Sequence, residues 1–227
     1  MTQGSTLVRI FSFLNGLMDY MDFKVGSADI AKHHGNLIIL AGGKSNDLKD
    51  ALKESIQYLC NRIYQVFKVR MFKDEDIFYI NHKTDQDFNG DGVPDGIVDQ
   101  STKSVQALTQ AIQWAKTQSN DGPLYLYLVD HGEKNGTFLV DSNQVLSAAQ
   151  LNVLLTDFES TGRTTVVILE ACYSGSFVAS LAGSHRVILT SANTDKYSFI
   201  GAGGKVSFDQ FLAIILWWAR AGSRPLI

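Results

Sequence analysis

The sequence has little cysteine, little proline and little net charge. It contains two cysteines and three prolines, and its 20 basic and 23 acidic residues leave a formal charge of −3. Two cysteines cannot build a disulfide framework, so each is interpreted first as a free thiol. The charge balance excludes a highly basic nucleic-acid arm, and 45% hydrophobic residues exclude a disordered chain. We expect one folded domain, or one domain with an appendage, that binds no nucleic acid.

Long apolar runs are also absent. The longest, at residues 211–219, is less than half of the roughly 20 residues that a membrane span needs. Near the N-terminus, Arg9 interrupts the apolar residues 7–13, and neither a basic segment nor a small-residue cleavage site accompanies them. We therefore expect no membrane span and no signal peptide in this chain, and its location in the cell is left unassigned.

What the sequence does contain is a regular alternation of short apolar runs and helical patterns. Residues 37–41 are an unbroken apolar run, typical of a strand buried on both faces. From residue 46 to residue 68, apolar residues recur at spacings of three and four, which predicts a helix with Cys60 on its buried stripe. The same reasoning predicts strands at 77–80, 124–129, 165–169 and 186–190, and helices at 102–116, 147–158 and 207–218.

This order of elements predicts an α/β fold, with a mainly parallel sheet covered by helices on both faces. In such sheets, functional residues gather just beyond the carboxyl ends of the strands. His131 follows the strand at 124–129, and Cys172 follows the strand at 165–169. We expect these two side chains to face each other across the edge of the sheet.

Cysteine and histidine are the minimum parts for acyl transfer. A thiol with a pKa of about 8.5 is a weak nucleophile, and a nearby imidazole increases the fraction of thiolate. Gly132 lets the backbone approach a substrate carbonyl, so its amide and that of Cys172 are candidates for an oxyanion hole. Alternatively, Cys172 closes a buried strand and His131 is a hydrogen-bonded turn residue. The paired positions favour the catalytic interpretation.

The two strand ends carry recognisable motifs. The first strand ends in DHG at residues 130–132, and the second ends in EACYSGS at residues 170–176. These motifs resemble the legumain, or asparaginyl endopeptidase, family of cysteine peptidases, whose wider fold is shared by caspases. The resemblance spans roughly residues 36–211 and includes AGG at 41–43, DEDIFYI at 74–80 and LTSAN at 189–193.

The resemblance implies a caspase-like three-layer α/β sandwich with His131 and Cys172 as catalytic dyad, and Gly132 beside Cys172 in the oxyanion hole. It also implies that Glu170 lines the pocket for the residue preceding the cut, and Ser191 is placed in the same pocket. An acidic Glu170 suits asparagine, a basic side chain or another polar side chain, and these alternatives stay open.

The resemblance divides the chain into two parts. Residues 1–35 are predicted to be an N-terminal extension, helical in structure, and residues 36–227 the peptidase domain. Little sequence follows the predicted helix at 207–218, which indicates either a truncated C-terminal end or an altered sheet edge.

Residues 85–99 form an acidic loop with oxygen-bearing side chains at alternating positions. This pattern suits calcium, a hard cation that takes 6 to 8 oxygen ligands. The loop is not a regular EF-hand, because Val98 stands where that motif has a bidentate glutamate. Affinity in the ~0.1 to 1 mM range of extracellular modules would favour an extracytoplasmic location, whereas the alternative is a solvated turn without metal. The candidate ligands are Asp85, Asp87, Asn89, Asp91, Asp95 and Asp99.

The leading hypothesis is a cysteine endopeptidase that cleaves a peptide or protein substrate through an acyl-thioester on Cys172, which water or an amine then resolves. The alternative is a catalytically silent, peptidase-like module that holds calcium and engages a protein partner. Redox sensing is the weakest hypothesis, because Cys60 is predicted to be buried in a distant helix and cannot act as a resolving thiol.

Overall fold

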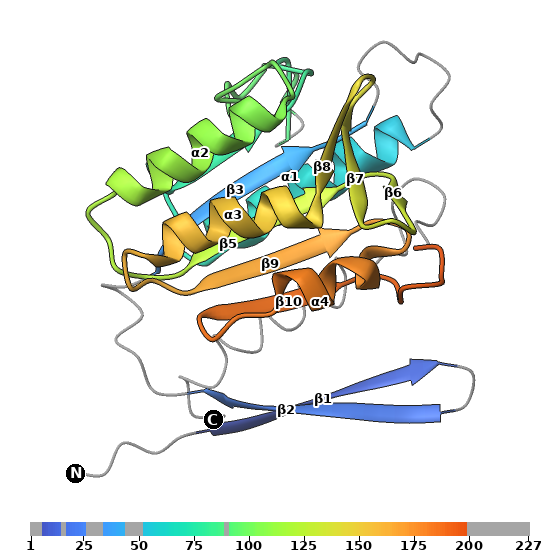
Figure 1. Cartoon of the computed structure of the whole chain (residues 1–227). Coiled ribbons are helices and arrows are strands. Elements are labelled where there is room, and N and C mark those ends of the chain that lie inside the picture. The colour runs from blue at the N-terminus through green and yellow to red at the C-terminus, as the bar shows by residue number, and fades with distance from the viewer. Residues whose placement is uncertain (1–5, 15–16, 26–33, 44–51, 89–90, 199–227) are drawn as a thin grey trace, which may run out of the picture.

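The computed structural model describes residues 6–14, 17–25, 34–43, 52–88 and 91–198. Its centre is a five-stranded sheet in the order β10-β9-β5-β3-β4, and every neighbouring pair is parallel (Figure 1). The sequence therefore predicted the sheet type correctly. The strands are β3 (Asn36–Ala41), β4 (Ile77–Ile80), β5 (Leu124–Val129), β9 (Thr165–Glu170) and β10 (Arg186–Thr190).

Helices cover both faces of this sheet. α1 (Lys53–Val69) packs on one face, and α2 (Val105–Thr117), α3 (Ala148–Glu159) and the short α4 (Val178–Leu181) pack on the other. Figure 1 shows α2 and α3 in front of the sheet and α1 behind it. The predicted three-layer α/β class is confirmed.

Each face of the sheet has its own hydrophobic core. Along β3, Ile38 and Leu40 face α2 and α3, whereas Leu37 and Ile39 face α1, because successive side chains of a strand point to opposite faces. All four are fully buried, which is why the strand is an unbroken apolar run in the sequence. Cys60 lies in the core on the α1 side, as its place on the helical stripe predicted.

Helix starts follow the capping rules on one face of the sheet and depart from them on the other. Ser104 caps α2 by accepting the backbone N–H of Ala107, and Ser147 forms the predicted capping box with Gln150 at the start of α3. In contrast, Leu52 precedes α1 and provides no side-chain cap.

The N-terminal extension is a correction to the predictions. Residues 1–35 were expected to be helical, but β1 (Thr6–Leu14) and β2 (Leu17–Val25) pair as an antiparallel hairpin. The sequence contains the reason: residues 6–14 are rich in β-branched and aromatic residues, and an Asn-Gly dipeptide at 15–16 is the strongest short signal for a hairpin.

A second small sheet was not predicted. Between β5 and α3 the chain forms β6 (Gly132–Glu133), β7 (Thr137–Asp141) and β8 (Gln144–Ser147), an antiparallel sheet ordered β6-β7-β8. Such short strands leave too few residues for a recognisable alternation. Its effect is to fix the chain immediately after His131, because Leu139 donates its N–H to the carbonyl of His131.

Some predictions fall on residues that the structure does not describe. They include the helix at 207–218, the first part of the helix predicted from residue 46 and the C-terminal end of the domain. Within the described part of the chain, no helix is long and apolar enough to cross a membrane.

Candidate active site

Parallel pairing brings the two predicted catalytic residues together. Val129, the last residue of β5, lies opposite Glu170, the last residue of β9. Asp130 then donates its N–H to the carbonyl of Glu170 at 3.2 Å, so the strands stay side by side beyond the sheet. His131 and Cys172 each follow the Val129–Glu170 pair by two residues and therefore leave the sheet at the same edge.

Gly132 contacts the backbone of Cys172 directly. A Cβ atom at position 132 would lie 2.2 Å from the Cys172 carbonyl oxygen and 3.1 Å from the Cβ of Ala171. Only glycine permits this approach, since real Cβ atoms do not come so close to a carbonyl. Steric crowding therefore explains why glycine stands at position 132, beside the predicted nucleophile.

The turn that carries Cys172 is sharp and held in place. Tyr173 has φ 54°, in the left-handed region that non-glycine residues rarely adopt, and the short 3₁₀ helix η2 (Ser174–Phe177) follows. The Cys172 side chain is half-buried, and the thiol is free. A strained residue directly after a reactive group is typical of sites where the backbone aims a side chain outward.

A neighbouring loop supports this turn through several hydrogen bonds. Gly175 donates its N–H to Ala192 at 2.9 Å, and the Ser174 hydroxyl accepts the N–H of Ala192 at 3.0 Å. Tyr173 donates its N–H to the carbonyl of Lys196 at 2.8 Å. The loop after β10 therefore preorganises the backbone around Cys172.

The imidazole of His131 is accessible, with 47% of its side chain exposed. The carboxylate of Asp130, which is fully buried, lies 4.0 Å from its Nε2 atom. This separation exceeds hydrogen-bond length.

An aromatic pair beside Cys172 was not identified from the sequence. The rings of Tyr173 and Tyr197 lie 5.0 Å apart between centroids, and the ammonium group of Lys134 lies 5.4 Å from the Tyr173 ring centroid. A hydrogen bond with Tyr197 raises the pKa of Tyr173 to about 12. Tyr173 therefore stays neutral at physiological pH and offers an aromatic surface rather than a charge.

The two predicted substrate-binding residues occupy different settings. Glu170 exposes none of its surface and accepts a 2.7 Å hydrogen bond from the hydroxyl of Tyr127. The hydroxyl of Ser191 accepts the N–H of Ala171 at 3.1 Å and lies 2.7 Å from the hydroxyl of Ser198. Both residues stand next to the Cys172 turn, and their contact with a substrate stays a prediction.

The carboxylates of the acidic loop bind the loop's own backbone. Asp87 accepts the N–H groups of Asp91 and Gly92, and Asp95 accepts the N–H of Phe88. Asp99, in contrast, accepts the N–H of Tyr79, a residue of β4, at 2.8 Å. Burial raises the pKa of the Asp99 carboxyl.

No cluster of three or more metal-ligating side chains occurs within the described ranges. Asp85 lies exposed before this turn, and Asn89 falls outside those ranges. A calcium site in the acidic loop therefore stays a prediction.

The second thiol is unsuited to catalysis. Cys60 is fully buried in α1, and desolvation raises its pKa well above the usual value. A buried thiol with a raised pKa forms little thiolate and is a poor nucleophile. Cys172 is therefore the better candidate of the two.

The fold and site together define a class, the α/β proteins with a thiol and an imidazole on adjacent parallel strand ends. A sequence model of the Peptidase C13 family matches residues 85–213, more than half of the chain, and includes both His131 and Cys172. The chain belongs to this family, the legumain or asparaginyl endopeptidase family of cysteine peptidases, and its sheet and helices are consistent with the family's caspase-like fold. A comparison with curated proteins finds no match.

Proposed function

We propose that this protein is a cysteine endopeptidase that cleaves peptide bonds through Cys172 and His131. Membership of the Peptidase C13 family supports a cysteine peptidase in general terms. The assignment of particular residues is supported by the pairing of Val129 with Glu170 and by the contact of Gly132 with Cys172. Both observations support a site in which a thiol, an imidazole and a closely packed glycine share one edge of the sheet.

The first half of the reaction forms the thioester. The thiolate of Cys172 attacks the peptide carbonyl, and the C–N bond breaks as His131 gives its proton to the leaving amine. The amide of Gly132, with that of Cys172, is the candidate donor pair for the oxyanion, and one such donor is worth ~3 kcal/mol. The acyl group is then held on sulfur.

The second half releases the acyl group. Water attacks the thioester while His131 accepts its proton, and the C–S bond breaks to give a carboxylic acid and the free thiol. If the amine of a second peptide attacks instead, a new peptide bond forms and the same thiol is released. Hydrolysis and transpeptidation thus differ only in the nucleophile that reaches the thioester.

Covalent labelling tests the proposal without knowledge of the natural substrate. Peptidyl acyloxymethyl ketones with Asn, Asp, Arg or Lys at the cleavage position are incubated with the protein, with and without calcium. We expect adduct formation on Cys172 and a preference for one of the four side chains, which would also define the pocket that Glu170 is predicted to line.

Two variants control this experiment. His131→Ala should abolish labelling, whereas His185→Ala, which alters an exposed histidine elsewhere, should leave the rate unchanged. Equal labelling of wild type and His131→Ala would contradict the dyad. No labelling of folded protein under any condition would favour the alternative, a silent module that binds a partner.

A further inference from the structure

A pocket lies beyond the carboxyl ends of β3 and β4, outside the Cys172 turn. Its walls come from four segments: the end of β3, the first turn of α1, the residue pair after β4 and the approach to α2. Its narrow interior opens to solvent, so it suits one small group rather than a drug-sized ligand. The residues used below are Gly42, Gly43, Lys53, Gln57, His82 and Lys103.

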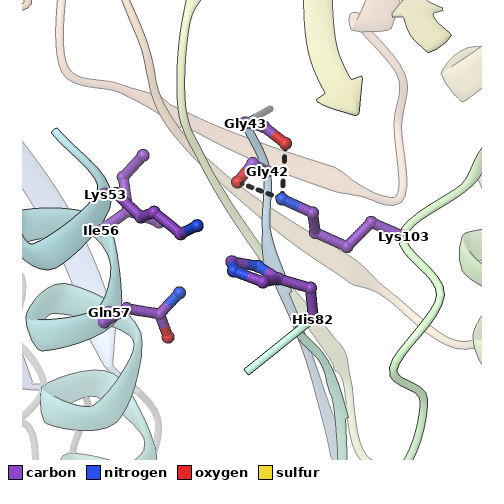
Figure 2. Close-up of a pocket in the computed structure, with 7 residues that line it drawn as sticks. All are labelled: Gly42, Gly43, Lys53, Ile56, Gln57, His82 and Lys103. Atoms are coloured by element: carbon purple, nitrogen blue, oxygen red, sulfur yellow. Dashed lines mark hydrogen bonds between the residues drawn. The ribbon is translucent and has the colours of Figure 1, made fainter. Parts of the chain in front are cut away.

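The deepest charged group in the pocket is Lys103, which is 2% exposed. Its ammonium group donates to the carbonyl oxygen of Gly42 at 2.9 Å and to that of Gly43 (Figure 2). An ammonium group has three N–H donors, and the described residues provide acceptors for two of them. Lys103 thus brings a buried positive charge with a remaining donor to the pocket.

Two further nitrogen groups converge on the same space. Figure 2 shows the ammonium group of Lys53 and the ring of His82 directed toward its centre. The side-chain amide of Gln57 also lines the pocket, but it is hydrogen-bonded to Asn81 and Gln86. The Nδ1 atom of His82 is buried and has no hydrogen-bond partner within the described ranges. A buried polar atom without a partner is uncommon and calls for a ligand or a water molecule.

The backbone adds to the positive potential. Lys53 is the first residue of α1, a 17-residue helix whose N-cap residue, Leu52, has no capping side chain. Such a helix end carries a partial positive charge and favours anions. The pocket also lies near the boundary between the neighbouring strands β3 and β5. After β3 the chain continues to a helix on one face of the sheet, and after β5 it continues to a helix on the other face. Ligands of open α/β sheets bind at such a boundary.

The negative groups nearby stand outside the pocket wall. Asp141 and Asp130 act on Lys103 through charge, and Asp141 also acts on His82, but neither carboxylate lines the pocket. Asp130 packs behind the glycine backbone, since a Cβ at Gly43 would lie 3.2 Å from its Oδ1 atom. An anion in the pocket would therefore meet Lys53 and Lys103 first.

The pocket is joined to the predicted dyad through backbone hydrogen bonds. Gly43 donates its N–H to Leu139, and Leu139 donates its N–H to His131 at 2.9 Å. The pocket and the predicted dyad therefore share one backbone hydrogen-bond path at the carboxyl edge of the sheet.

We propose that this pocket binds a carboxylate, and that the carboxylate is an acidic side chain of the peptide substrate at a position other than the cleaved residue. The second half of this statement rests on the proposed peptidase function, whereas the first half does not. A free small carboxylate would satisfy the same groups, so the test must separate the two sources.

Histidine NMR on the Cys172→Ala variant provides that test, because this variant leaves the pocket intact and requires no catalysis. In the first arm, acetate is titrated at constant ionic strength while the His82 resonance, assigned with His82→Gln, is followed. The pKa of His82 is lowered to about 4 by desolvation and by Lys103 and Lys53. Acetate should shift the resonance saturably and raise this pKa, since a nearby negative charge favours the imidazolium.

The second arm uses decapeptides, each with one Asp, beside counterparts with Asn at that position. At one position, the Asp peptide should bind about tenfold more tightly. In both arms Lys53→Gln should weaken binding about tenfold, whereas Lys73→Gln, the same charge change at an exposed lysine outside the pocket, should change it less than about twofold.

The outcomes separate cleanly. Absence of a saturable shift with acetate would overturn the carboxylate site. Acetate binding without an Asp preference at any peptide position would overturn the substrate assignment and leave a free carboxylate as the ligand. Failure of covalent labelling in the wild type would count against the peptidase function alone, because both arms use a variant that lacks the nucleophile.

Discussion

The sheet edge at His131 and Cys172 and the acidic loop at 85–99 were both proposed as sites from residue spacing, but the structure treats them differently. At the sheet edge, paired backbone positions place both residues two positions beyond the same strand ends. In the acidic loop, the carboxylates of Asp87 and Asp95 accept hydrogen bonds from backbone N–H groups of the loop itself. The first region presents its reactive groups outward, and the second satisfies them internally.

The difference lies in what holds the residues in place. The sheet fixes the positions of residues at the ends of parallel strands. Residues at the ends of two neighbouring strands therefore lie close to each other. Aspartates in a loop can bind a metal or stabilise a turn with the same side chains, and spacing alone does not decide between these uses. The predictions below test this contrast.

The largest effect is expected from loss of the dyad. Cys172→Ala or His131→Ala should lower kcat/KM for a cleaved peptide by about 10⁴-fold, because the thiolate nucleophile or its proton carrier is removed. His185→Ala should retain wild-type activity. Steady-state kinetics on folded variants measure this, and activity of Cys172→Ala within tenfold of wild type would exclude the mechanism.

Gly132→Ala should have the next largest effect. The new Cβ would lie 2.2 Å from the Cys172 carbonyl oxygen, so the backbone must shift. We expect a loss of about 10²-fold in kcat through the disturbed oxyanion donors and about 1 to 3 kcal/mol in stability.

Gly183→Ala is the matched control for this glycine, because its Cβ would meet nothing closer than 3.9 Å. Kinetics and urea unfolding of both variants decide the point. Equal behaviour of the two alanine variants would show that the approach of Gly132 to Cys172 has no functional role.

Tyr127→Phe should destabilise the protein by about 1 to 3 kcal/mol, because it leaves the buried carboxyl group of Glu170 without the 2.7 Å hydrogen bond. Tyr58→Phe is the control, since Tyr58 is 45% exposed. Urea unfolding measures both. A loss no greater for Tyr127→Phe than for the control would show that the hydrogen bond is not maintained in solution.

Calcium is expected to have a smaller effect. If the acidic loop binds it with a Kd of ~0.1 to 1 mM, about 5 mM calcium should raise the unfolding free energy by roughly 1 to 2 kcal/mol. The double variant Asp87→Asn with Asp91→Asn should abolish this gain. Calorimetric titration that detects no heat of binding in the wild type would identify the loop as a self-bonded turn.

The smallest effect concerns acid stability. The pKa of His82 falls from 6.5 to about 4 on folding, chiefly through desolvation. The unfolded chain therefore binds a proton first, and stability decreases as pH falls from about 6.5 toward 4. His82→Gln should flatten this part of the curve of unfolding free energy against pH. An unchanged slope would show that His82 is protonated equally in both states.

The parallel sheet was largely predictable because its strands are buried on both faces and stand out as apolar runs. The edge positions of His131 and Cys172 followed from those runs. The N-terminal hairpin was predictable in principle, through the Asn-Gly dipeptide at 15–16, but its sequence was interpreted as helical.

Other features required the folded chain. Lys103 meets Gly42 across 61 positions of sequence, and no local pattern marks this contact. The hydroxyl of Tyr127 on β5 donates to Glu170 on β9, 43 positions away, and no sequence pattern marks this pair either. Side-chain partners that are distant in sequence depend on tertiary packing, which a single sequence does not specify.

The proposed mechanism requires an acyl-thioester at Cys172. The direct measurement is mass spectrometry of protein that has been acid-quenched during incubation with a peptide selected by the covalent probes. The mechanism predicts an acyl adduct that maps to Cys172, disappears with added hydroxylamine and is absent in Cys172→Ala. Turnover of the peptide with no adduct on Cys172, or with an adduct on another residue, would contradict it.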